Sequence, residues 1–385
     1  MSKTVVVLGA GLGGIPVAHW LAAKSTQSDP ELRVILVAPN DEFFWNIASP
    51  RVIIPGAMGE DKVLYSIKDA FSKYSDDKFE FVAGKAEELH PDANSVTVAL
   101  NDGTKRDIPY HTIVIATGAD ARDDMPWKVV GTSQQTRAAI SQLRDQIEKA
   151  SSIVVGGAGI TGVEVAGELG YTYAKSGAKS ITIISADSLP LESRIMTSTR
   201  ETAKKELEKL QVKYISNARI SGVTASEDGG KIVKLTKTDS TEVELKTDLF
   251  IPAYGIKYNT EFTPSEMRDD SGRLHQDTSL RSPQYKNVFI VGDAGNLQVA
   301  QAAVLGAQVE YLVKQFERYF KDGQMDAYKP DPKILLALSI GPSRATGQLG
   351  MWKPFNIILW WFKARYMGTD TAGDFVQGTK ILKTK

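Results

Sequence analysis

Two glycine-rich loops are the part of this sequence whose residue types and spacing best suit chemistry. Residues 9–14 read Gly-Ala-Gly-Leu-Gly-Gly, and residues 157–162 read Gly-Ala-Gly-Ile-Thr-Gly. In such a loop the first glycine permits a tight turn, the second lets the backbone approach a pyrophosphate, and the last lets a helix pack closely on a strand. The helix that follows offers unpaired N–H groups to the phosphates. The sequence therefore predicts two dinucleotide sites, one built on Gly9, Gly11 and Gly14 and the other on Gly157, Gly159 and Gly162.

The strand after each loop should carry the group that binds the adenosine ribose, commonly an acidic residue at the strand end. In the first unit the strand expected at residues 32–37 is followed by Ala-Pro-Asn-Asp, so Asn40 or Asp41 would supply this contact from a shifted turn. In the second unit the strand expected at residues 180–184 is followed by Ser-Ala-Asp, without an acid directly at its end. The choice between NADH and NADPH is therefore left open.

Two further strand ends carry residues that could hold a cofactor. Residues 112–116 form an apolar run that ends in Thr117 and Gly118, a small turn that lets the chain pass close to a ligand. Residues 287–291 form a similar run, followed by Gly-Asp. Asp293 could hydrogen-bond the hydroxyls of a ribityl chain, although an isolated aspartate here would as readily be a turn or capping residue. Because Asp293 follows both glycine loops in the sequence, the cofactor role is favoured.

One carboxylate follows the second loop. Glu164 lies two residues past the last glycine, which places it in the expected first turn of the next helix. There it could act at a nicotinamide nucleotide, or it could only stabilise the positive end of the helix dipole.

The composition excludes several other chemistries. The chain has no cysteine, so it forms no disulfide, no thiolate metal site and no redox-active dithiol, and electrons must pass through a bound cofactor. The four histidines are scattered, and we expect no metal site. Basic and acidic residues number 46 each, so nucleic acid is not an expected partner.

These motifs must be positioned by an α/β fold. The order strand, glycine loop, helix, strand occurs at residues 4–37 and again at residues 152–184. We therefore predict two Rossmann-like dinucleotide-binding domains, one inserted in the other, plus a smaller C-terminal domain. The predicted boundaries are 1–122 and 259–325 for the two parts of the FAD-binding domain, 123–258 for the NAD(P)H-binding domain, and 326–385 for a C-terminal acceptor or interface region.

The C-terminal region is both basic and aromatic. Residues 331–385 contain eight Lys or Arg and three Asp, a net charge of +5, and three of the six tryptophans, namely Trp352, Trp360 and Trp361. The apolar run at residues 355–362 is too short to cross a bilayer. Together with Lys353, Lys363 and Arg365 it suits an anionic membrane surface, but it could equally be an ordinary apolar cap over the flavin. The N-terminus enters the first strand directly, so we expect a cytoplasmic protein, with a peripheral location on a membrane as the alternative.

The order of these motifs resembles that of flavoproteins with two dinucleotide-binding domains. The chain is most similar to the apoptosis-inducing-factor-homologous family, which includes the ferroptosis-suppressor-like proteins and fungal relatives, and more distantly to type II NADH dehydrogenases. Residues 43–51, Phe-Phe-Trp-Asn-Ile-Ala-Ser-Pro-Arg, are similar to a segment that the family places near the flavin. The resemblance implies FAD contacts from the first loop and from Arg51, Thr117, Gly118 and Asp293. It implies a nicotinamide-nucleotide site from the second loop and Glu164.

The resemblance also bears on the acceptor. Lys363 matches a C-terminal lysine that the family holds near the flavin and its acceptor. The aromatic residue that the family carries a few positions later is Gly368 here, or is replaced by Tyr366, which leaves the acceptor open.

The expected activity is hydride transfer from NADH or NADPH to FAD, then electron transfer to a quinone-type acceptor without a redox disulfide. One alternative is a biosynthetic flavoenzyme acting on an aromatic or polyketide-like small molecule. Another, of a different class, is a redox-sensing regulatory flavoprotein. Both the acceptor and the oligomeric state are left open by the sequence.

Overall fold

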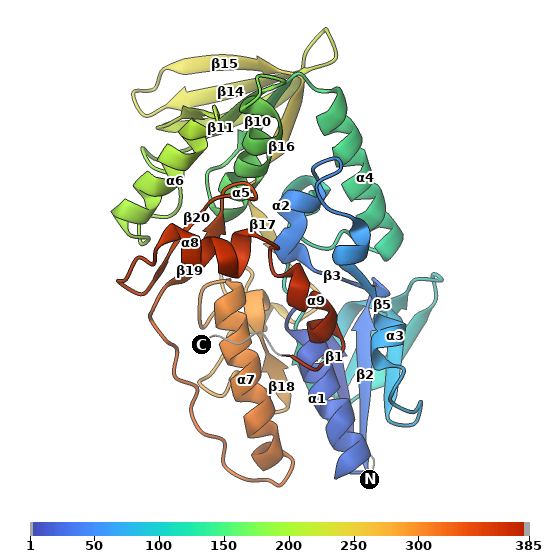
Figure 1. Ribbon diagram of the computed structural model, residues 1–385. Coiled ribbons are helices and arrows are strands. Elements are labelled where there is room, and N and C mark those ends of the chain that lie inside the picture. Colours follow the sequence, from blue (N-terminus) through green and yellow to red (C-terminus); the bar gives the residue numbers. More distant parts are fainter. Residues whose placement is uncertain (1–2, 381–385) are drawn as a thin grey trace.

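The computed structural model describes residues 3–380, and its larger sheet forms the lower lobe in Figure 1. Seven strands run in the order β18-β8-β1-β2-β5-β6-β7. The first five are parallel neighbours, and β6 and β7 extend β5 as an antiparallel meander. The strands are β1 (Lys3–Leu8), β2 (Leu32–Ala38), β5 (Phe79–His90), β6 (Ser95–Leu100), β7 (Lys105–Pro109), β8 (Thr112–Ile115) and β18 (Val288–Ile290).

The apolar sequence of β1 reflects burial on both faces of this sheet. Val5 and Val7 belong to one hydrophobic core, whereas Val6 and Leu8 belong to a second, because alternate side chains of a strand point to opposite faces. Helices α1 (Gly14–Gln27) and α7 (Ala302–Tyr319) pack side by side on one face. The glycine loop between β1 and α1 is thereby fixed at the carboxyl ends of the parallel strands, where α/β proteins bind ligands.

The second sheet forms the upper lobe and repeats this arrangement at smaller scale. Four parallel strands run in the order β12-β11-β10-β16, and a three-stranded antiparallel sheet β13-β14-β15 packs beside them. The strands are β10 (Ser152–Gly156), β11 (Ser180–Ile184), β12 (Lys213–Ile215), β13 (Ala218–Ala225), β14 (Lys231–Lys237), β15 (Glu242–Thr247) and β16 (Leu249–Pro252). The helices of this lobe are α4 (Ser133–Lys149), α5 (Ile160–Leu169), which continues as a π-helix over Gly170–Ala174, and α6 (Thr197–Lys209).

The two segments where the chain is predicted to pass from one domain to the other lie side by side. Strand β9 (Ala119–Ala121) pairs antiparallel with β17 (Ile256–Tyr258), and these strands adjoin the predicted boundaries at 122/123 and 258/259. This pairing is the arrangement expected when one unit is inserted in another. The boundaries themselves stay a prediction.

The C-terminal segment returns to the junction of the two lobes (Figure 1). A hairpin of β19 (Leu335–Ser339) and β20 (Ala345–Leu349) leads into α8 (Asn356–Leu359), a π-helix over Trp360–Ala364, and α9 (Thr369–Val376). Helix α9 reaches the lower lobe, because His19 of α1 hydrogen-bonds the carbonyl oxygen of Val376 at 2.8 Å. Within residues 3–380 no helix is long and apolar enough to cross a membrane.

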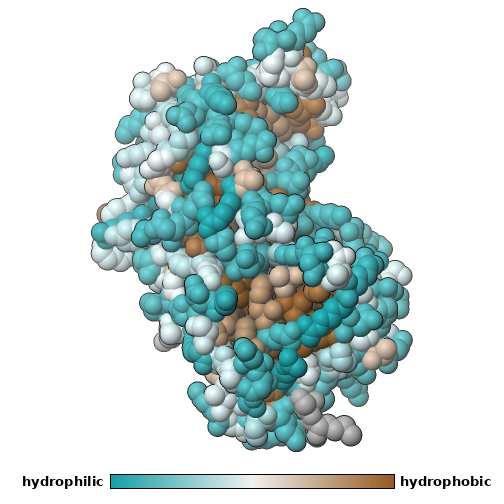
Figure 2. Space-filling view, turned by 90° about the vertical axis from the view of Figure 1, so that its right-hand side faces the viewer, coloured by the Kyte–Doolittle hydropathy of each residue, from teal (hydrophilic) through white to brown (hydrophobic). Residues whose placement is uncertain are grey.

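Short elements complete the lower lobe next to the junction. They are β3 (Glu42–Phe44), α2 (Ser49–Val52), β4 (Leu64–Ser66) and α3 (Ile67–Phe71). Figure 2, which looks onto the right-hand side of Figure 1, shows a constriction between the lobes and hydrophobic residues gathered in a hollow of the lower lobe. Exposed apolar surface of this kind is typical of ligand sites.

Candidate active site

The first glycine loop has the geometry of a phosphate cradle. Gly9 adopts φ +100° next to the carbonyl oxygen of Ala116, where no other residue fits without strain. A Cβ on Gly14 would collide with the carbonyl oxygen of Gly9, because α1 starts directly against the loop. A Cβ on Gly11 would meet no atom within 4 Å. The loop therefore packs tightly at its ends and leaves its centre open to a ligand.

The second loop repeats this packing at its three motif glycines, although α5 already begins within the loop, at Ile160. Gly157 has φ +93° beside the carbonyl of Ala253, and a Cβ on Gly162 would collide with the carbonyl oxygen of Gly157. Gly159 again has no atom within 4 Å of its ideal Cβ. Since each loop precedes a helix N-terminus, both fit the pyrophosphate of a dinucleotide. The structure thus contains two such sites, one in each lobe.

Asp293 lies at the end of β18 beside the first loop. An ideal Cβ on Gly13 would lie 3.5 Å from the side chain of Val291 and 3.7 Å from that of Ala116, so the loop meets the ends of β18 and β8. The Asp293 carboxylate accepts a hydrogen bond from Lys128 Nζ at 2.9 Å. Lys128 was not singled out by the sequence, because it lies in an irregular connection without a motif. The predicted FAD contact of Asp293 stays a prediction.

Thr117 and Gly118 follow β8 at the crossing between the lobes. The Thr117 hydroxyl donates to the carbonyl oxygen of Asn259 at 2.6 Å, and the Asn259 N–H donates to the Gly118 carbonyl at 3.0 Å. Gly118 has φ +64° and open space at its Cβ position. The hydroxyl of Thr117 thus stabilises the crossing, while Gly118 leaves space beside it.

Asn40 and Asp41 occupy the turn after β2. Asn40 is buried, and its amide nitrogen donates to the carbonyl oxygen of Glu42 at 2.7 Å, whereas Asp41 is exposed. The amide nitrogen of Asn40 therefore holds a turn of the lobe itself. Its contact with the adenosine ribose stays a prediction.

Arg51 has a partner that the sequence did not indicate. Its guanidinium donates twice to Glu168 Oε1, at 2.7 and 3.1 Å, and once to the carbonyl oxygen of Arg365 at 3.1 Å. Both side chains are almost fully buried, with 6% of Arg51 and 2% of Glu168 exposed. Burial raises the pKa of the Glu168 carboxyl, and the Arg51 guanidinium opposes this shift. Arg51 therefore joins α2 to α5 and to the C-terminal π-helix, and its predicted FAD contact stays untested.

Glu164 lies one helical turn before Glu168. The expectation that it stabilises the first turn of its helix is wrong, because α5 begins at Ile160 and no acidic residue lies in its first turn. Its carboxylate instead accepts two hydrogen bonds, from the N–H and hydroxyl of Ser339, both at 3.2 Å, and forms an ion pair with Lys363 Nζ at 3.0 Å. The structure thereby brings together the two residues predicted to be catalytic, from segments about 200 positions apart in the chain.

Geometry excludes an aromatic side chain at one of the two positions where the sequence analysis looked for it near Lys363. Gly368 has φ +74°, and a Cβ there would lie 2.9 Å from the ring of Trp45, so no aromatic side chain fits. Tyr366 is partly exposed, and the Arg365 guanidinium lies 4.7 Å from its ring centre. Position 368 therefore cannot carry the aromatic side chain, and the alternative, Tyr366, stays a prediction.

A surface made of α8, the π-helix and the turn before them exposes large apolar side chains. Phe355, Trp361 and Phe362 are 76%, 66% and 75% exposed, and Met351, Trp352, Ile357 and Ile358 are exposed beside them. We call these seven residues the aromatic surface. Two of the basic residues expected to flank this surface make contacts within the protein. Lys353 donates to Ser198 and Thr202 of α6, and Lys363 pairs with Glu164.

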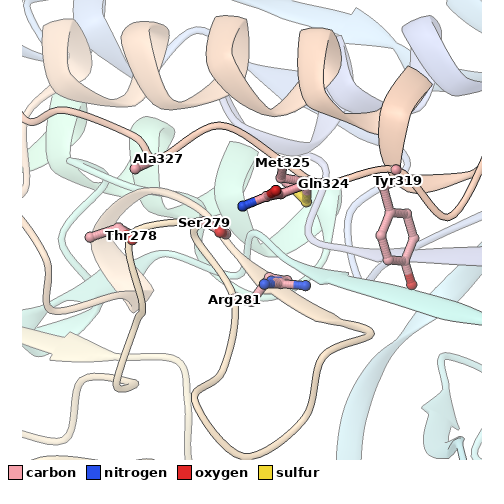
Figure 3. A pocket seen from close by; sticks show the side chains of 8 residues that line it. Thr278, Ser279, Arg281, Tyr319, Gln324, Met325 and Ala327 are labelled. Atoms are coloured by element: carbon pink, nitrogen blue, oxygen red, sulfur yellow. The ribbon is translucent and has the colours of Figure 1, made fainter.

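Two other features of the described residues lie apart from this chemistry. A cavity of about 410 Å³ is lined by residues of the lower lobe, none of them a predicted site residue: Thr278, Ser279, Arg281, Tyr319, Gly323, Gln324, Met325 and Ala327 (Figure 3). Over residues 3–380, no group of three or more His, Asp or Glu is placed to hold a metal ion.

Fold and site together define an oxidoreductase with two dinucleotide-binding units. The chain belongs to the pyridine nucleotide-disulphide oxidoreductase family, whose model matches residues 3–307. Oxidoreductase ptaL of Pestalotiopsis fici is 33% identical over 91% of this chain and 92% of its own length. Ferroptosis suppressor protein 1 of Homo sapiens is 26% identical over 90% of this chain and 88% of its own length. The predicted resemblance is therefore confirmed.

Solved structures show the same fold at low sequence identity. The sulfide:quinone oxidoreductase of Aquifex aeolicus superposes with a TM-score of 0.78 at 17% identity, covering 99% of this chain and 93% of its own. NDH2 of Plasmodium falciparum in complex with NADH gives 0.78 at 14% identity, covering all of both chains. FAD and NAD(P)H are the cofactors of this family, and the two open loops fit them.

Proposed function

We propose that the protein takes hydride from NADH or NADPH and passes electrons to a quinone-type acceptor. The observation that carries this proposal is the absence of cysteine in a member of a family named for disulphide chemistry. Without a dithiol, electrons from the flavin must go directly to a diffusible acceptor. The sulfide:quinone oxidoreductase that shares this fold acts on a quinone, which supports that acceptor class.

The Glu164–Lys363 pair is the group that we assign to the acceptor side. When bound, FAD accepts hydride from the nicotinamide nucleotide and releases two electrons to an acceptor. Reduction of a quinone also requires protons. Lys363 is about one fifth exposed and is ion-paired with a carboxylate that is 5% exposed, so it can exchange protons with solvent from a fixed position. Glu164 holds the ammonium group, and Ser339 orients Glu164.

We further propose that the aromatic surface is the side from which an apolar acceptor enters. Seven large apolar side chains exposed on one short helical segment form the kind of patch that marks membrane or partner contact. Since Lys353 and Lys363 are paired internally, attachment should depend on apolar insertion more than on headgroup charge.

The acceptor assignment is tested by steady-state turnover of the FAD-loaded protein. NADH or NADPH is supplied with a short-chain quinone, a long-chain quinone in vesicles, or oxygen alone. We expect quinone turnover to exceed oxygen turnover by at least about tenfold. Flavin reduction by NAD(P)H without any quinone turnover would overturn the proposal.

The aromatic surface is tested separately. Phe355→Ser with Phe362→Ser should lower binding to vesicles and turnover with a long-chain quinone, and should leave flavin reduction by NAD(P)H unchanged. Lys333→Met, on an exposed lysine outside the aromatic surface, is the control. Unchanged vesicle binding in the double variant would assign this surface to another partner. Point variants are preferred to truncation, because deletion of the segment would also remove Ser339 and Lys363.

A second candidate is an oxidoreductase that modifies an aromatic or polyketide-like small molecule. It is favoured by the higher identity to the fungal oxidoreductases ptaL and phnG, 33% and 28%, than to human ferroptosis suppressor protein 1, 26%. Product analysis with hydroquinone-type aromatic compounds distinguishes the two. Stoichiometric formation of an altered aromatic product, with poor turnover of simple quinones, would favour the second candidate.

A further inference from the structure

Lys128 lies where the two lobes and the flavin site meet, although no sequence motif marks it. The residue before it, Trp127, donates its indole N–H to the carbonyl oxygen of Pro252, at the end of β16, at 2.9 Å. The amide of Asn46, in the segment that resembles a flavin-proximal region, donates to the Trp127 carbonyl at 3.1 Å. Both lobes thus fix the backbone at this position.

The side chain of Lys128 points to the cofactor end of β18. Its Nζ donates to Asp293 Oδ2 at 2.9 Å, and 33% of Lys128 and 16% of Asp293 are exposed. Within residues 3–380 the other carboxylate oxygen, Oδ1, has no hydrogen-bond partner. Lys128 therefore fixes one oxygen of the carboxylate and leaves the second free to accept from a hydroxyl.

Charge gives this pair a functional consequence. The pyrophosphate of a dinucleotide carries two negative charges, and the first glycine loop brings it to the strand ends beside Asp293. An unpaired carboxylate there would repel the phosphates, because two negative charges close together at a partly buried site are poorly screened by solvent. A lysine paired with Asp293 cancels this repulsion.

We infer that Lys128 is a positioning residue for FAD: it neutralises Asp293 and orients its carboxylate toward the sugar-like chain of the cofactor. Because FAD must bind before any acceptor is reduced, this role is independent of whether the acceptor is a quinone. It also distinguishes Lys128 from Lys363, which belongs to the acceptor side.

The test measures FAD affinity of the apoprotein by flavin fluorescence, so it needs no turnover. Lys128→Met should raise the Kd for FAD about tenfold, which corresponds to about 1.4 kcal/mol. Lys128→Arg, which keeps the charge, should stay within about threefold of wild type. Lys68→Met, at an exposed lysine of α3, is the matched control and should change nothing.

Two further measurements separate a role toward FAD from a merely structural one. In the double variant Lys128→Met with Asp293→Asn, the loss of affinity should be smaller than the sum of the two single losses, because the repelling carboxylate is gone. The thermal midpoint of the apoprotein should fall less in Lys128→Met than that of the FAD complex. The inference is overturned if Lys128→Met binds FAD as wild type does, or if Lys128→Arg is as weak as Lys128→Met.

Discussion

The helices that follow the two glycine loops occupy equivalent places but are attached to the molecule by different forces. Counting from the first glycine of each loop, Glu164 and Glu168 of α5 correspond to Pro16 and Trp20 of α1. Helix α5 carries two buried acids, which are paired with Lys363 and Arg51 from distant segments. Helix α1 has no acid within it. It is held by apolar packing, by the buried imidazole of His19 and by a partly exposed ion pair between Lys24 and Glu317 of α7.

We propose that this difference suits FAD held permanently at the first loop and a nicotinamide nucleotide that exchanges at the second. Both helices pack into the same hydrophobic core, α1 through residues such as Ile15 and Val17, and α5 through Val163 and Val165. Helix α5 is joined in addition by two ion pairs, one with Arg51 of α2 and one with Lys363 of the C-terminal segment. A change at the second loop can therefore reach the C-terminal segment through a charged contact, whereas α1 reaches that segment through an uncharged one, between His19 and Val376.

The largest expected effect, on cofactor binding and flavin reduction, comes from replacing the central glycine of one loop at a time with valine. Gly11→Val should abolish FAD binding, whereas Gly159→Val should keep FAD and slow flavin reduction by NAD(P)H at least about a hundredfold. Neither position has atoms near its ideal Cβ, so both variants should fold. Flavin absorbance and stopped-flow reduction measure the two properties, and each variant is the control for the other. Loss of FAD in Gly159→Val would show that the two sites are assigned in reverse.

Arg51→Met tests the attachment of α5. It leaves Glu168 charged and unpaired in the interior, which typically costs about 3–5 kcal/mol of unfolding free energy. Urea unfolding at pH 7 measures this, and Arg51→Met with Glu168→Met should recover most of the loss. Arg33→Met breaks a much more exposed pair with Glu80 and should cost less than about 1 kcal/mol. Equal losses in both single variants would contradict the special role of the buried pair.

The attachment of α1 should instead depend on pH. Burial lowers the pKa of His19 to about 4, against 6.5 for a free imidazole. The unfolded chain therefore takes up this proton at higher pH than the folded chain. The contribution of His19 to stability is complete above about pH 6.5 and is lost as the pH falls toward 4, a change of about 3 kcal/mol.

Urea unfolding of wild type and His19→Phe at several pH values between 7 and 4 isolates this contribution from those of the carboxyl groups. The stability difference between the two proteins should change in favour of the variant as the pH falls. A difference independent of pH would show that His19 is not buried in its neutral form.

The smallest effect on stability is expected at the pair of Glu164 and Lys363. Glu164→Gln should cost about 1 kcal/mol or less, because Lys363 reaches solvent and Ser339 still contacts residue 164. Lys363→Met leaves a carboxylate that is 5% exposed without its charged partner and should cost more than this, but less than Arg51→Met, because Ser339 still donates to Glu164. Turnover with a quinone should fall about tenfold in both, at unchanged FAD content. Steady-state kinetics with FAD-loaded protein measures this, and Lys333→Met is the control. Full turnover in Lys363→Met would remove Lys363 from the reaction.

Local sequence determined much of the molecule. The two glycine loops, the apolar strands before them and the order of the later strand ends predicted both dinucleotide units, because steric limits at Gly9, Gly14, Gly157 and Gly162 act within a few residues. The absence of cysteine was by itself enough to exclude electron transfer through a redox-active disulphide. The short apolar run at residues 355–362 likewise predicted a helical segment that does not span a membrane.

Only the tertiary structure decided which charged groups meet. Glu168 and Lys128 carry no motif, and their partners Arg51 and Asp293 lie 117 and 165 positions away. The same holds for Glu164, whose partner comes from the C-terminal segment and not from its own helix end. Ion pairs between distant segments depend on where the chain brings side chains after folding, and nothing in local spacing encodes that position. Burial then decided their energy, since a charge without its partner in the interior costs far more than the same charge in water.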